Sequence, residues 1–189
     1  MAQKTLKVGF DLDGVILYNP FRIVRPFIAI FKKIVLGFDH RPLKFYYPKT
    51  RLERYFWRVA HKSSFFIGYG FWEILTLIKK RRIKAYIITA RFSFLENDLN
   101  RKIKQLGIKK YFSAIYFNRK DEQPHLFKEK MIKKLGLDVY VEDNWDIVRY
   151  LNLKVKSQKS KVYWIYNILD RKIKYQYKFS SLKKVAKKL

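Results

Sequence analysis

Hydrophobic and polar positions show two patterns along the chain, one typical of helices and one typical of strands. The alternation of these patterns predicts an α/β fold. From Phe71 onwards, stretches with apolar residues three and four apart, typical of helices, alternate with short apolar runs typical of buried strands. Such alternation is expected for a parallel sheet with helices on both faces. The predicted strands cover 83–90, 112–117, 137–143 and 161–167, and the predicted helices cover 71–82, 96–107, 126–136, 146–152 and, after a serine cap, 179–189.

The first apolar run, VGFDLDGVI at positions 8–16, is predicted to be a strand that ends in two aspartates. Residues two apart share one face of a strand, so Asp11 and Asp13 can converge on one metal ion or reacting group while Leu12 points into the core. Gly14 then allows a sharp turn. The carboxyl end of such a strand is where ligands bind in open α/β sheets. An ordinary polar turn, where Asp and Gly are common, is the alternative interpretation.

Residues 18–70 differ in character and are predicted to be a helical insert outside the sheet. They contain 11 Lys and Arg residues, two acidic residues and 14 aromatic residues. Apolar spacing predicts helices at 21–38 and 52–66, and the sequence GYG at 68–70 predicts a turn or hinge. We expect most of the aromatic side chains to form a small core of the insert and to dock on the sheet.

Length and composition narrow the possible chemistry. A chain of 189 residues with 49% hydrophobic content can bury one core and carry a small accessory module. It has no cysteine, which excludes disulfides, thiolate nucleophiles and zinc-thiolate sites, and its three histidines show no ligand spacing. Catalysis would therefore use carboxylates, lysines and hydroxyls. With no signal-like segment and no apolar run of the ~18 residues that a membrane span needs, we expect a cytoplasmic protein.

The chain is strongly basic, with 43 Lys and Arg residues against 15 Asp and Glu residues and a formal net charge of +28. Such a field attracts phosphates of any kind, whether in nucleotides, nucleic acid or anionic lipid headgroups. Lysines are spread over every segment, however, which is also the pattern of a cell with a basic proteome. Both interpretations of the charge stay open.

Four short motifs follow one another at the predicted strand ends. They are DLDG at 11–14, ITAR at 88–91, a lysine on the helix at 126–136, and VEDN at 141–144. In this order they resemble the motifs of the haloacid dehalogenase-like (HAD) hydrolases, and the resemblance spans nearly the whole chain. Each motif alone occurs often by chance, so their order at strand ends is the specific signal.

The resemblance implies an α/β fold of the HAD-like Rossmannoid type, a three-layer sandwich around a central parallel sheet. The catalytic core would comprise 1–17 and 71–189, and 18–70 would form a small helical cap of the C1 type beside the first motif. The combination of DxDGV, ITAR and a helical insert is most similar to the 5'(3')-deoxyribonucleotidase-like phosphatases.

By this resemblance Asp11 is the nucleophile that forms an aspartyl phosphate, and Asp13 is the general acid and base. A carboxylate nucleophile divides the slow hydrolysis of a phosphate ester into two easier steps. Asp13 would protonate the leaving oxygen and then deprotonate the attacking water. One of the two aspartates must be protonated for part of the cycle, and we expect their proximity to push their pKa values apart in the way this requires.

The remaining motif residues would bind the phosphoryl group. Thr89 is expected to hydrogen-bond a phosphoryl oxygen beside Ala90, and a helix lysine is expected to supply a fixed positive charge. Lys128 and Lys130 are both candidates, and the spacing to the last motif favours Lys128. Arg91 either contacts the substrate or starts a helix or turn.

A magnesium site is expected next to the nucleophile. Mg²⁺ favours carboxylate and carbonyl oxygens, which suits Asp11, the backbone carbonyl of Asp13 and Asp143, with Glu142 in the outer shell. Asn144 could contact the substrate or belong to a turn or helix start.

Asp146 could orient a metal-bound water or cap the helix at 146–152. Capping is the preferred interpretation of the two, because aspartate is common at helix N-termini.

The function that this resemblance implies is Mg²⁺-dependent hydrolysis of a small phosphomonoester. A nucleotide is the favoured substrate, and insert residues such as Arg22, Arg25, Tyr46 and Trp57 are expected to select it. One alternative is a nucleic-acid-binding or nucleic-acid-end-processing phosphatase that uses the basic surface. A third interpretation makes FIAIFKKIVLGF at 27–38 a membrane-surface contact. Nothing in the sequence indicates an oligomeric state.

Overall fold

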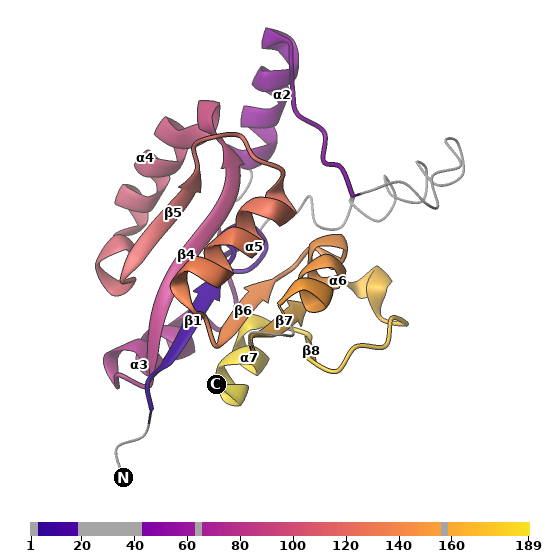
Figure 1. Cartoon of the computed structure of the whole chain (residues 1–189). Helices are drawn as coiled ribbons and strands as arrows, with labels where there is room; N and C mark the ends of the chain where they lie inside the picture. The colour runs from indigo at the N-terminus through magenta and orange to yellow at the C-terminus, as the bar shows by residue number, and fades with distance from the viewer. Residues whose placement is uncertain (1–3, 19–42, 63–65, 156–158) are drawn as a thin grey trace.

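A parallel six-stranded sheet forms the centre of the protein in the computed structural model, which describes residues 4–18, 43–62, 66–155 and 159–189 (Figure 1). The strand order is β5-β4-β1-β6-β7-β8, and every neighbouring pair in it is parallel. The strands are β1 (Leu6–Phe10), β4 (Ile83–Phe92), β5 (Ala114–Asn118), β6 (Val139–Glu142), β7 (Lys161–Ile165) and β8 (Lys178–Phe179).

Helices cover both faces of this sheet, which confirms the three-layer α/β architecture. They are α3 (Phe71–Lys79), α4 (Glu96–Leu106), α5 (Pro124–Leu135), α6 (Trp145–Lys154) and α7 (Leu182–Lys188), with short 3-10 turns η2 (Ser93–Leu95), η3 (Lys109–Tyr111) and η5 (Ile168–Asp170). Apolar residues of α3, α4 and α7 share one core with Ile87 and Val141, whereas those of α5 and α6 share another with Ile88 and Tyr140. Successive strand residues thus enter opposite cores, which explains why the strands read as continuous apolar runs.

The topology gathers the motifs at one edge of the sheet. β1 lies between β4 and β6, so Phe10 pairs with Ile87 on one side and with Val141 on the other. Asp11, Thr89 and Glu142 therefore follow these paired positions along the same edge. This is the edge at which open α/β sheets bind ligands.

The insert is joined to the sheet through a short antiparallel ribbon, β2 (Leu17–Tyr18) and β3 (Phe66–Ile67). Between these strands lies α2 (Arg51–Lys62), which projects from the rest of the molecule in Figure 1. The helix predicted at 52–66 is thus too long: it ends at Lys62, and Phe66 is extended because it pairs with Tyr18.

The helix predicted at 21–38 lies outside the described residues, and so does the proposed membrane contact at 27–38. The division of the chain into a core and a cap at 18–70 stays a prediction.

Other local predictions can be compared directly with the structure. Gly70 has a φ of 106° in the turn before α3, as expected from GYG, and a Cβ there would lie 2.0 Å from the Lys183 nitrogen. The closing helix is confirmed, since the Ser181 hydroxyl accepts a hydrogen bond from the Lys184 backbone nitrogen. β4 extends two residues beyond its predicted end, which places Arg91 in the strand. Within the described ranges, no helix has the length and apolar character needed to cross a bilayer.

Candidate active site

A cavity of about 520 Å³ opens at the carboxyl edge of the sheet, and every site residue expected from the four motifs lines it. The motif residues come from the ends of β1, β4 and β6 and from α5. The insert contributes the opposite wall with Phe45, Tyr46, Trp57 and His61. The sheet and the insert thus enclose one space.

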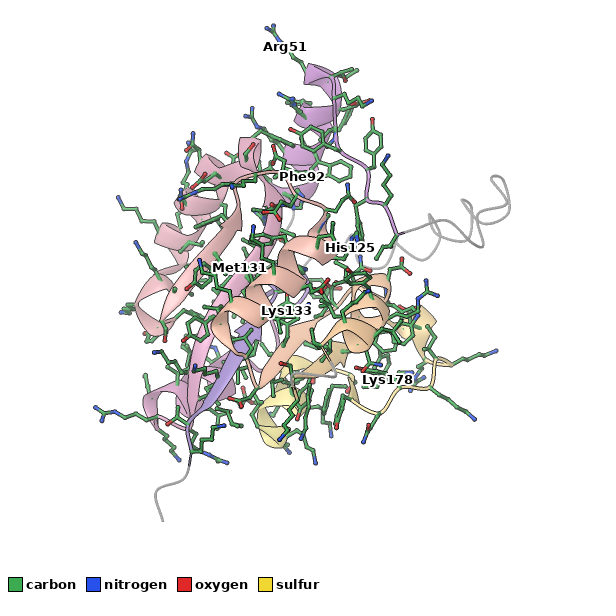
Figure 2. All side chains as sticks on the ribbon, viewed as in Figure 1. Arg51, Phe92, His125, Met131, Lys133 and Lys178 are labelled. Atoms are coloured by element: carbon green, nitrogen blue, oxygen red, sulfur yellow. The ribbon has the colours of Figure 1, made fainter. Side chains whose placement is uncertain are left out.

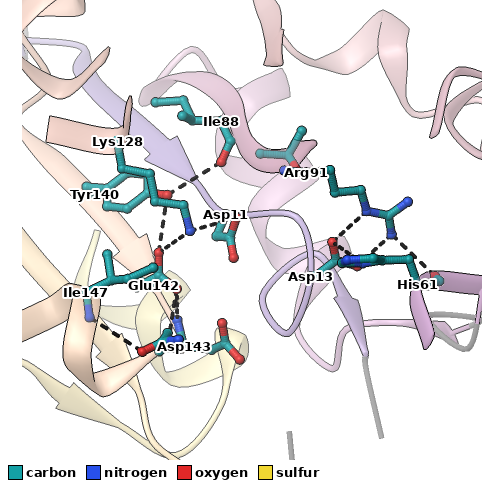
Figure 3. Close-up of polar contacts among 12 residues, drawn as sticks. Asp11, Asp13, His61, Ile88, Arg91, Lys128, Tyr140, Glu142, Asp143 and Ile147 are labelled. Atoms are coloured by element: carbon teal, nitrogen blue, oxygen red, sulfur yellow. Dashed lines mark hydrogen bonds and ion pairs between the residues drawn. The ribbon is translucent and has the colours of Figure 1, made fainter. Parts of the chain in front are cut away.

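Lys128 lies between two carboxylates on the floor of this cavity (Figure 3). Its Nζ is 3.2 Å from Asp11 Oδ1 and 2.6 Å from Glu142 Oε2, and its side chain is 3% exposed. Burial opposes its charge, but the two carboxylates outweigh this and raise the pKa of Lys128 well above its usual value. Lys130 is 56% exposed and pairs with Glu122 at the surface. The structure therefore brings Lys128, and not Lys130, to the site.

Glu142 is fully buried and organises the end of β6. Its Oε1 accepts hydrogen bonds from the backbone nitrogens of Asp143 and Asn144, each at 3.0 Å, and its Oε2 accepts from Lys128 and, at 3.4 Å, from the Tyr140 hydroxyl. These contacts occupy both of its oxygens and fix the turn that carries Asp143. Such an arrangement suits the outer-shell role expected of Glu142.

Three buried carboxylates form a cluster with the chemistry of a divalent-cation site. Asp11, Glu142 and Asp143 each offer an oxygen, and these atoms lie within 4.8 Å of one another. Burial raises the pKa of Asp11 well above its ordinary value, and although Lys128 opposes this, the negative charges of Glu142 and Asp143 add to it. A hard cation would relieve that repulsion, and oxygen ligands are those that Mg²⁺ prefers. The donor set therefore fits the expected ion.

Asp13 belongs to a second group of contacts, centred on Arg91 (Figure 3). Arg91 donates through Nε to Asp13 Oδ2 and through Nη2 to Asp13 Oδ1, both at 2.7 Å, and the two side chains are almost completely buried. The same oxygen, Asp13 Oδ2, is 3.6 Å from Nδ1 of His61, which comes from α2. A bidentate guanidinium is among the strongest partners available to a carboxylate.

These contacts give the opposite order of pKa values to the one that the expected roles of Asp11 and Asp13 require. Burial by itself would raise the pKa of Asp13, but the charge and hydrogen bonds of Arg91, together with His61, hold it well below its usual range. Asp11, the expected nucleophile, has the raised pKa instead. In this arrangement Asp13 is an ionised acceptor, so it can carry a proton only after the Arg91 contact has loosened.

The alternative for Arg91 as a helix-start or turn residue is wrong, because Arg91 lies within β4. Its place in the cavity wall leaves contact with a substrate as a prediction. Thr89 and Ala90 also line the cavity, and Thr89 is 1% exposed. Their expected contacts with a phosphoryl group likewise stay predictions.

The start of α6 differs from the preferred interpretation of Asp146. Asn144 is the N-cap, and its Oδ1 accepts hydrogen bonds from the backbone nitrogens of Asp146 at 3.0 Å and Ile147 at 3.4 Å. The expectation that Asp146 caps this helix is therefore wrong, since the helix begins one residue earlier, at Trp145. Asp146 lies in the first turn and lines the cavity.

Several site residues were not anticipated from the sequence. His61 has no motif around it and reaches Asp13 only because α2 folds back over the cavity. Trp164 donates from Nε1 to the Asp143 carbonyl at 3.2 Å and thereby supports the turn that carries Asp143. Tyr140 carried a usable signal, since it is two residues before Glu142 and so shares its face of β6.

The insert wall is aromatic. The rings of Tyr46 and Trp57 are 6.3 Å apart, and Trp57 is the same distance from His61. Tyr46 also donates from its hydroxyl to Glu53 at 2.6 Å, which fixes it against α2. Tyr46 and Trp57 thus line the cavity as selectors of a substrate would, whereas Arg22 and Arg25 lie outside the described residues.

Comparison with known proteins identifies the fold. No protein-family model matches the chain, and no curated protein matches it in sequence. Among solved structures, it is similar to a HAD-superfamily hydrolase from Ehrlichia chaffeensis, with 13% identity, a TM-score of 0.52, and coverage of 99% of this chain and 97% of that one.

Two further structures agree. A family IA HAD hydrolase from Entamoeba histolytica is 14% identical with a TM-score of 0.59 over 94% of both chains. CbbY from Rhodobacter sphaeroides, solved in complex with phosphate, is 12% identical with a TM-score of 0.58 over 96% of both. The chain therefore has the fold of the HAD-like hydrolases. The likeness to the deoxyribonucleotidases is not confirmed.

Proposed function

We propose that the protein is a Mg²⁺-dependent phosphatase that hydrolyses a small phosphomonoester through an aspartyl-phosphate intermediate on Asp11. The observation that carries this proposal is the position of Asp11. It is buried, lies 3.2 Å from the Lys128 ammonium, and belongs to a cluster of three carboxylates in a cavity shared with Asp13 and Thr89. A phosphate is also the ligand of CbbY, one of the structures with this fold.

The residues divide the reaction into two displacements. A carboxylate oxygen of Asp11 attacks phosphorus, the bond to the leaving oxygen breaks, and Asp13 gives that oxygen a proton. Water then attacks the phosphorus of the aspartyl phosphate, Asp13 takes its proton, the bond to Asp11 breaks and inorganic phosphate leaves. Lys128 favours the ionised form of Asp11 against the burial that raises its pKa, and it offsets negative charge on the phosphoryl group. Mg²⁺ held by Asp11, Asp143 and the Asp13 carbonyl would supply further charge neutralisation.

The first displacement requires a protonated Asp13, whereas the observed contact with Arg91 favours the carboxylate. A phosphate ester entering the cavity brings a second anion that a guanidinium can bind in bidentate fashion. Competition between the two anions for Arg91 would free Asp13 to take up a proton. Arg91 would then bind the phosphoryl group and control the charge of Asp13 in the same step.

Within this class we favour a nucleotide as the substrate. The cavity wall beyond the phosphoryl site contains Phe45, Tyr46 and Trp57, whose rings can stack on a planar base, and Lys44 adds a positive charge. A net charge of +28 draws anionic substrates toward the cavity. The alternative, the terminal phosphate of a nucleic acid, would use the same catalytic residues and is distinguished by the substrate panel below.

The direct test measures phosphate release from an aryl phosphate with and without Mg²⁺. We expect activity that chelation abolishes and Mg²⁺ restores, and that is lost in Asp11→Asn. Asp138→Asn is the matched control, because it makes the same change before β6, at the opposite edge of the sheet from the cavity. A wild-type protein without activity, or an active Asp11→Asn variant, would contradict the proposal.

The substrate class requires a panel of nucleoside monophosphates, sugar phosphates and 5'-phosphorylated oligonucleotides. We expect nucleotides to have the highest kcat/KM, and Trp57→Ala to lower that value for nucleotides while leaving the aryl phosphate almost unaffected. Melting temperatures separate this effect from loss of folding. A preference for oligonucleotide ends would favour nucleic-acid processing, and an unchanged ranking in Trp57→Ala would remove the support for stacking.

A further inference from the structure

The helix α2 has its apolar residues on the outside. Leu52, Tyr55, Phe56 and Val59 follow the spacing of one helix face, and each is between 48% and 65% exposed. We call these four residues the α2 stripe. Helices on the surface of a globular domain normally turn such a stripe toward the core. Here no described residue covers it.

The face of α2 that turns toward the protein is polar and aromatic instead. Trp57 and His61 point into the catalytic cavity, and the Arg54 guanidinium lies over the ring of Phe94 at 5.6 Å. Glu53 is held by the Tyr46 hydroxyl and by the backbone nitrogens of Lys49 and Thr50, at 2.6 to 3.0 Å. These contacts fix the rotation of the helix, so the outward position of the stripe is built into the fold.

Three basic residues follow one edge of the stripe, because Arg51, Arg58 and Lys62 share one side of the helix at its spacing of 3.6 residues per turn. Arg51, Arg58 and Lys62 are exposed, and Arg51 extends from the end of α2 into solvent (Figure 2). Arg58 remains 51% exposed despite its ion pair with Asp98. Glu53, the single acidic residue of α2, lies beside the other edge of the stripe, where the Tyr46 hydroxyl and two backbone nitrogens hold its carboxylate. The outer surface of the helix is thus apolar along its centre and cationic along one edge.

We propose that the α2 stripe and its flanking cations form a docking surface for an anionic lipid bilayer. A helix with aromatic and aliphatic residues on one side, basic residues beside them and low net hydrophobicity is the type that lies in a membrane interface. Anionic headgroups attract the flanking cations while the stripe enters the acyl boundary. The proposal goes beyond the phosphatase activity and does not depend on it.

Two other occupants fit the surface less well. A second copy of the chain would bring two equally basic edges together in a two-fold contact, with +28 on each partner. A nucleic acid would satisfy the cations and could stack on Tyr55 and Phe56, but it would leave the aliphatic side chains of Leu52 and Val59 without an apolar partner. A bilayer uses both the charges and the aliphatic surface.

The experiment measures flotation of the full chain with vesicles of phosphatidylcholine alone and with added phosphatidylglycerol, at about 0.15 M salt. We expect binding only with the anionic lipid. Leu52→Ser/Phe56→Ser should lower the partition coefficient by at least about tenfold, because buried apolar groups contribute strongly to interfacial binding. The matched control is Leu153→Ser, which removes a leucine that is 71% exposed on α6. It should bind like the wild type.

A second readout separates insertion from adsorption by charge. Because the chain has no cysteine, Phe56→Cys and Leu153→Cys can each be labelled with one environment-sensitive fluorophore. We expect a blue shift and quenching by spin-labelled lipid at position 56 and neither at position 153. Circular dichroism checks that every variant is folded.

The outcomes that overturn the proposal are distinct. Equal partitioning of the double serine variant and Leu153→Ser would mean that only the overall charge binds vesicles. A probe at position 56 that does not respond to vesicles would exclude insertion. A wild-type dimer by light scattering that the double variant loses would assign the stripe to a second copy, and a response to single-stranded DNA but not to vesicles would assign it to nucleic acid.

Discussion

Replacing Arg91 by methionine tests whether this guanidinium holds Asp13 in its charged form. Arg91 makes two hydrogen bonds of 2.7 Å to Asp13, and both side chains are less than a tenth exposed. Methionine keeps much of the length and apolar volume of arginine but removes the charge and the donors. The substitution therefore leaves a buried carboxylate without its guanidinium, and His61 Nδ1 stays 3.6 Å from Asp13 Oδ2.

The expected cost follows from this geometry. Two unit charges about 3 Å apart attract each other by roughly 6 kcal/mol at an effective dielectric constant of about 20, before desolvation is subtracted. Breaking a buried pair by removing one partner typically costs about 3–5 kcal/mol. Because His61 remains beside the carboxylate, we expect a loss near the lower end, about 3 kcal/mol in the free energy of unfolding.

Urea unfolding at pH 7 measures this loss, and a double-mutant cycle assigns it to the pair. Asp13→Asn removes the other charge, and in the double variant neither buried charge is left unpaired. We expect the double variant to be more stable than Arg91→Met, with a coupling energy of at least about 2 kcal/mol. A loss below about 1 kcal/mol in Arg91→Met, or additive effects in the cycle, would refute the reasoning.

The same pair gives a sign for the dependence of stability on pH. The pKa of Asp13 is lower in the folded protein than in the unfolded chain, where it is about 3.9. Its contribution is therefore complete above that pH and is lost as the pH falls through the folded value. The wild type should lose more stability than Arg91→Met over this acidic range, and equal losses would contradict the assignment.

Three further predictions follow from contacts elsewhere in the site. Lys128→Met should lower the free energy of unfolding at pH 7 by about 3–5 kcal/mol, because it leaves buried carboxylates unpaired. Lys130→Met should change it by less than about 0.5 kcal/mol, and similar effects of the two variants in urea unfolding would contradict the buried position of Lys128. Mg²⁺ should raise the melting temperature of the wild type by binding to the native state, and an equal rise in Asp143→Asn would exclude that ligand. Burial lowers the pKa of His125 below its unfolded value of about 6.5, so the free energy of unfolding should decline as the pH falls below that value. His125→Phe should make this decline less steep, and an unchanged slope in pH-dependent unfolding would exclude His125 as its source.

The arrangement of the core could be predicted because its signals are local. Strands buried on both faces must be continuously apolar, and the helices between them must carry one apolar side. The periodicity of hydrophobic residues therefore identifies both. Once parallel strands are assumed, their carboxyl ends meet at one edge, which brings Asp11, Thr89 and Asp143 together. The position of Lys128 followed from its spacing to the last motif. These inferences needed no knowledge of distant contacts.

The contact between Arg91 and Asp13 could not be predicted in the same way. β4 continues past Thr89, and its pairing with β5 shifts register between Thr89 and Phe92. Such irregularities re-aim side chains near functional sites and depend on the neighbouring strand, which the local sequence does not describe. His61 is harder still, because its contact with Asp13 depends on how the insert folds over the sheet.

The orientation of α2 shows where the usual rule for amphipathic helices fails. The spacing of its apolar residues correctly predicts a helix. The rule that apolar residues face inward, however, predicts the wrong face of α2 to lie against the protein. Trp57 and His61 face the cavity, and the apolar stripe faces outward. Departures from sequence rules are expected where function competes with packing. The expectation that most insert aromatics form a core is accordingly wrong for Tyr55 and Phe56.

The distribution of charge links the two sides of the proposed chemistry. The chain has 15 acidic residues against 43 basic ones, yet Asp11, Asp13, Glu142 and Asp143 all line one cavity. The basic surface attracts phosphate esters, whereas the buried carboxylates repel them. Burial raises the pKa of Asp11, and the negative charges of Glu142 and Asp143 add to the rise. Lys128 offsets only part of that negative charge. A divalent cation beside Asp11 would offset the rest, so this charge pattern supports the proposal of a site that binds both a phosphate ester and Mg²⁺.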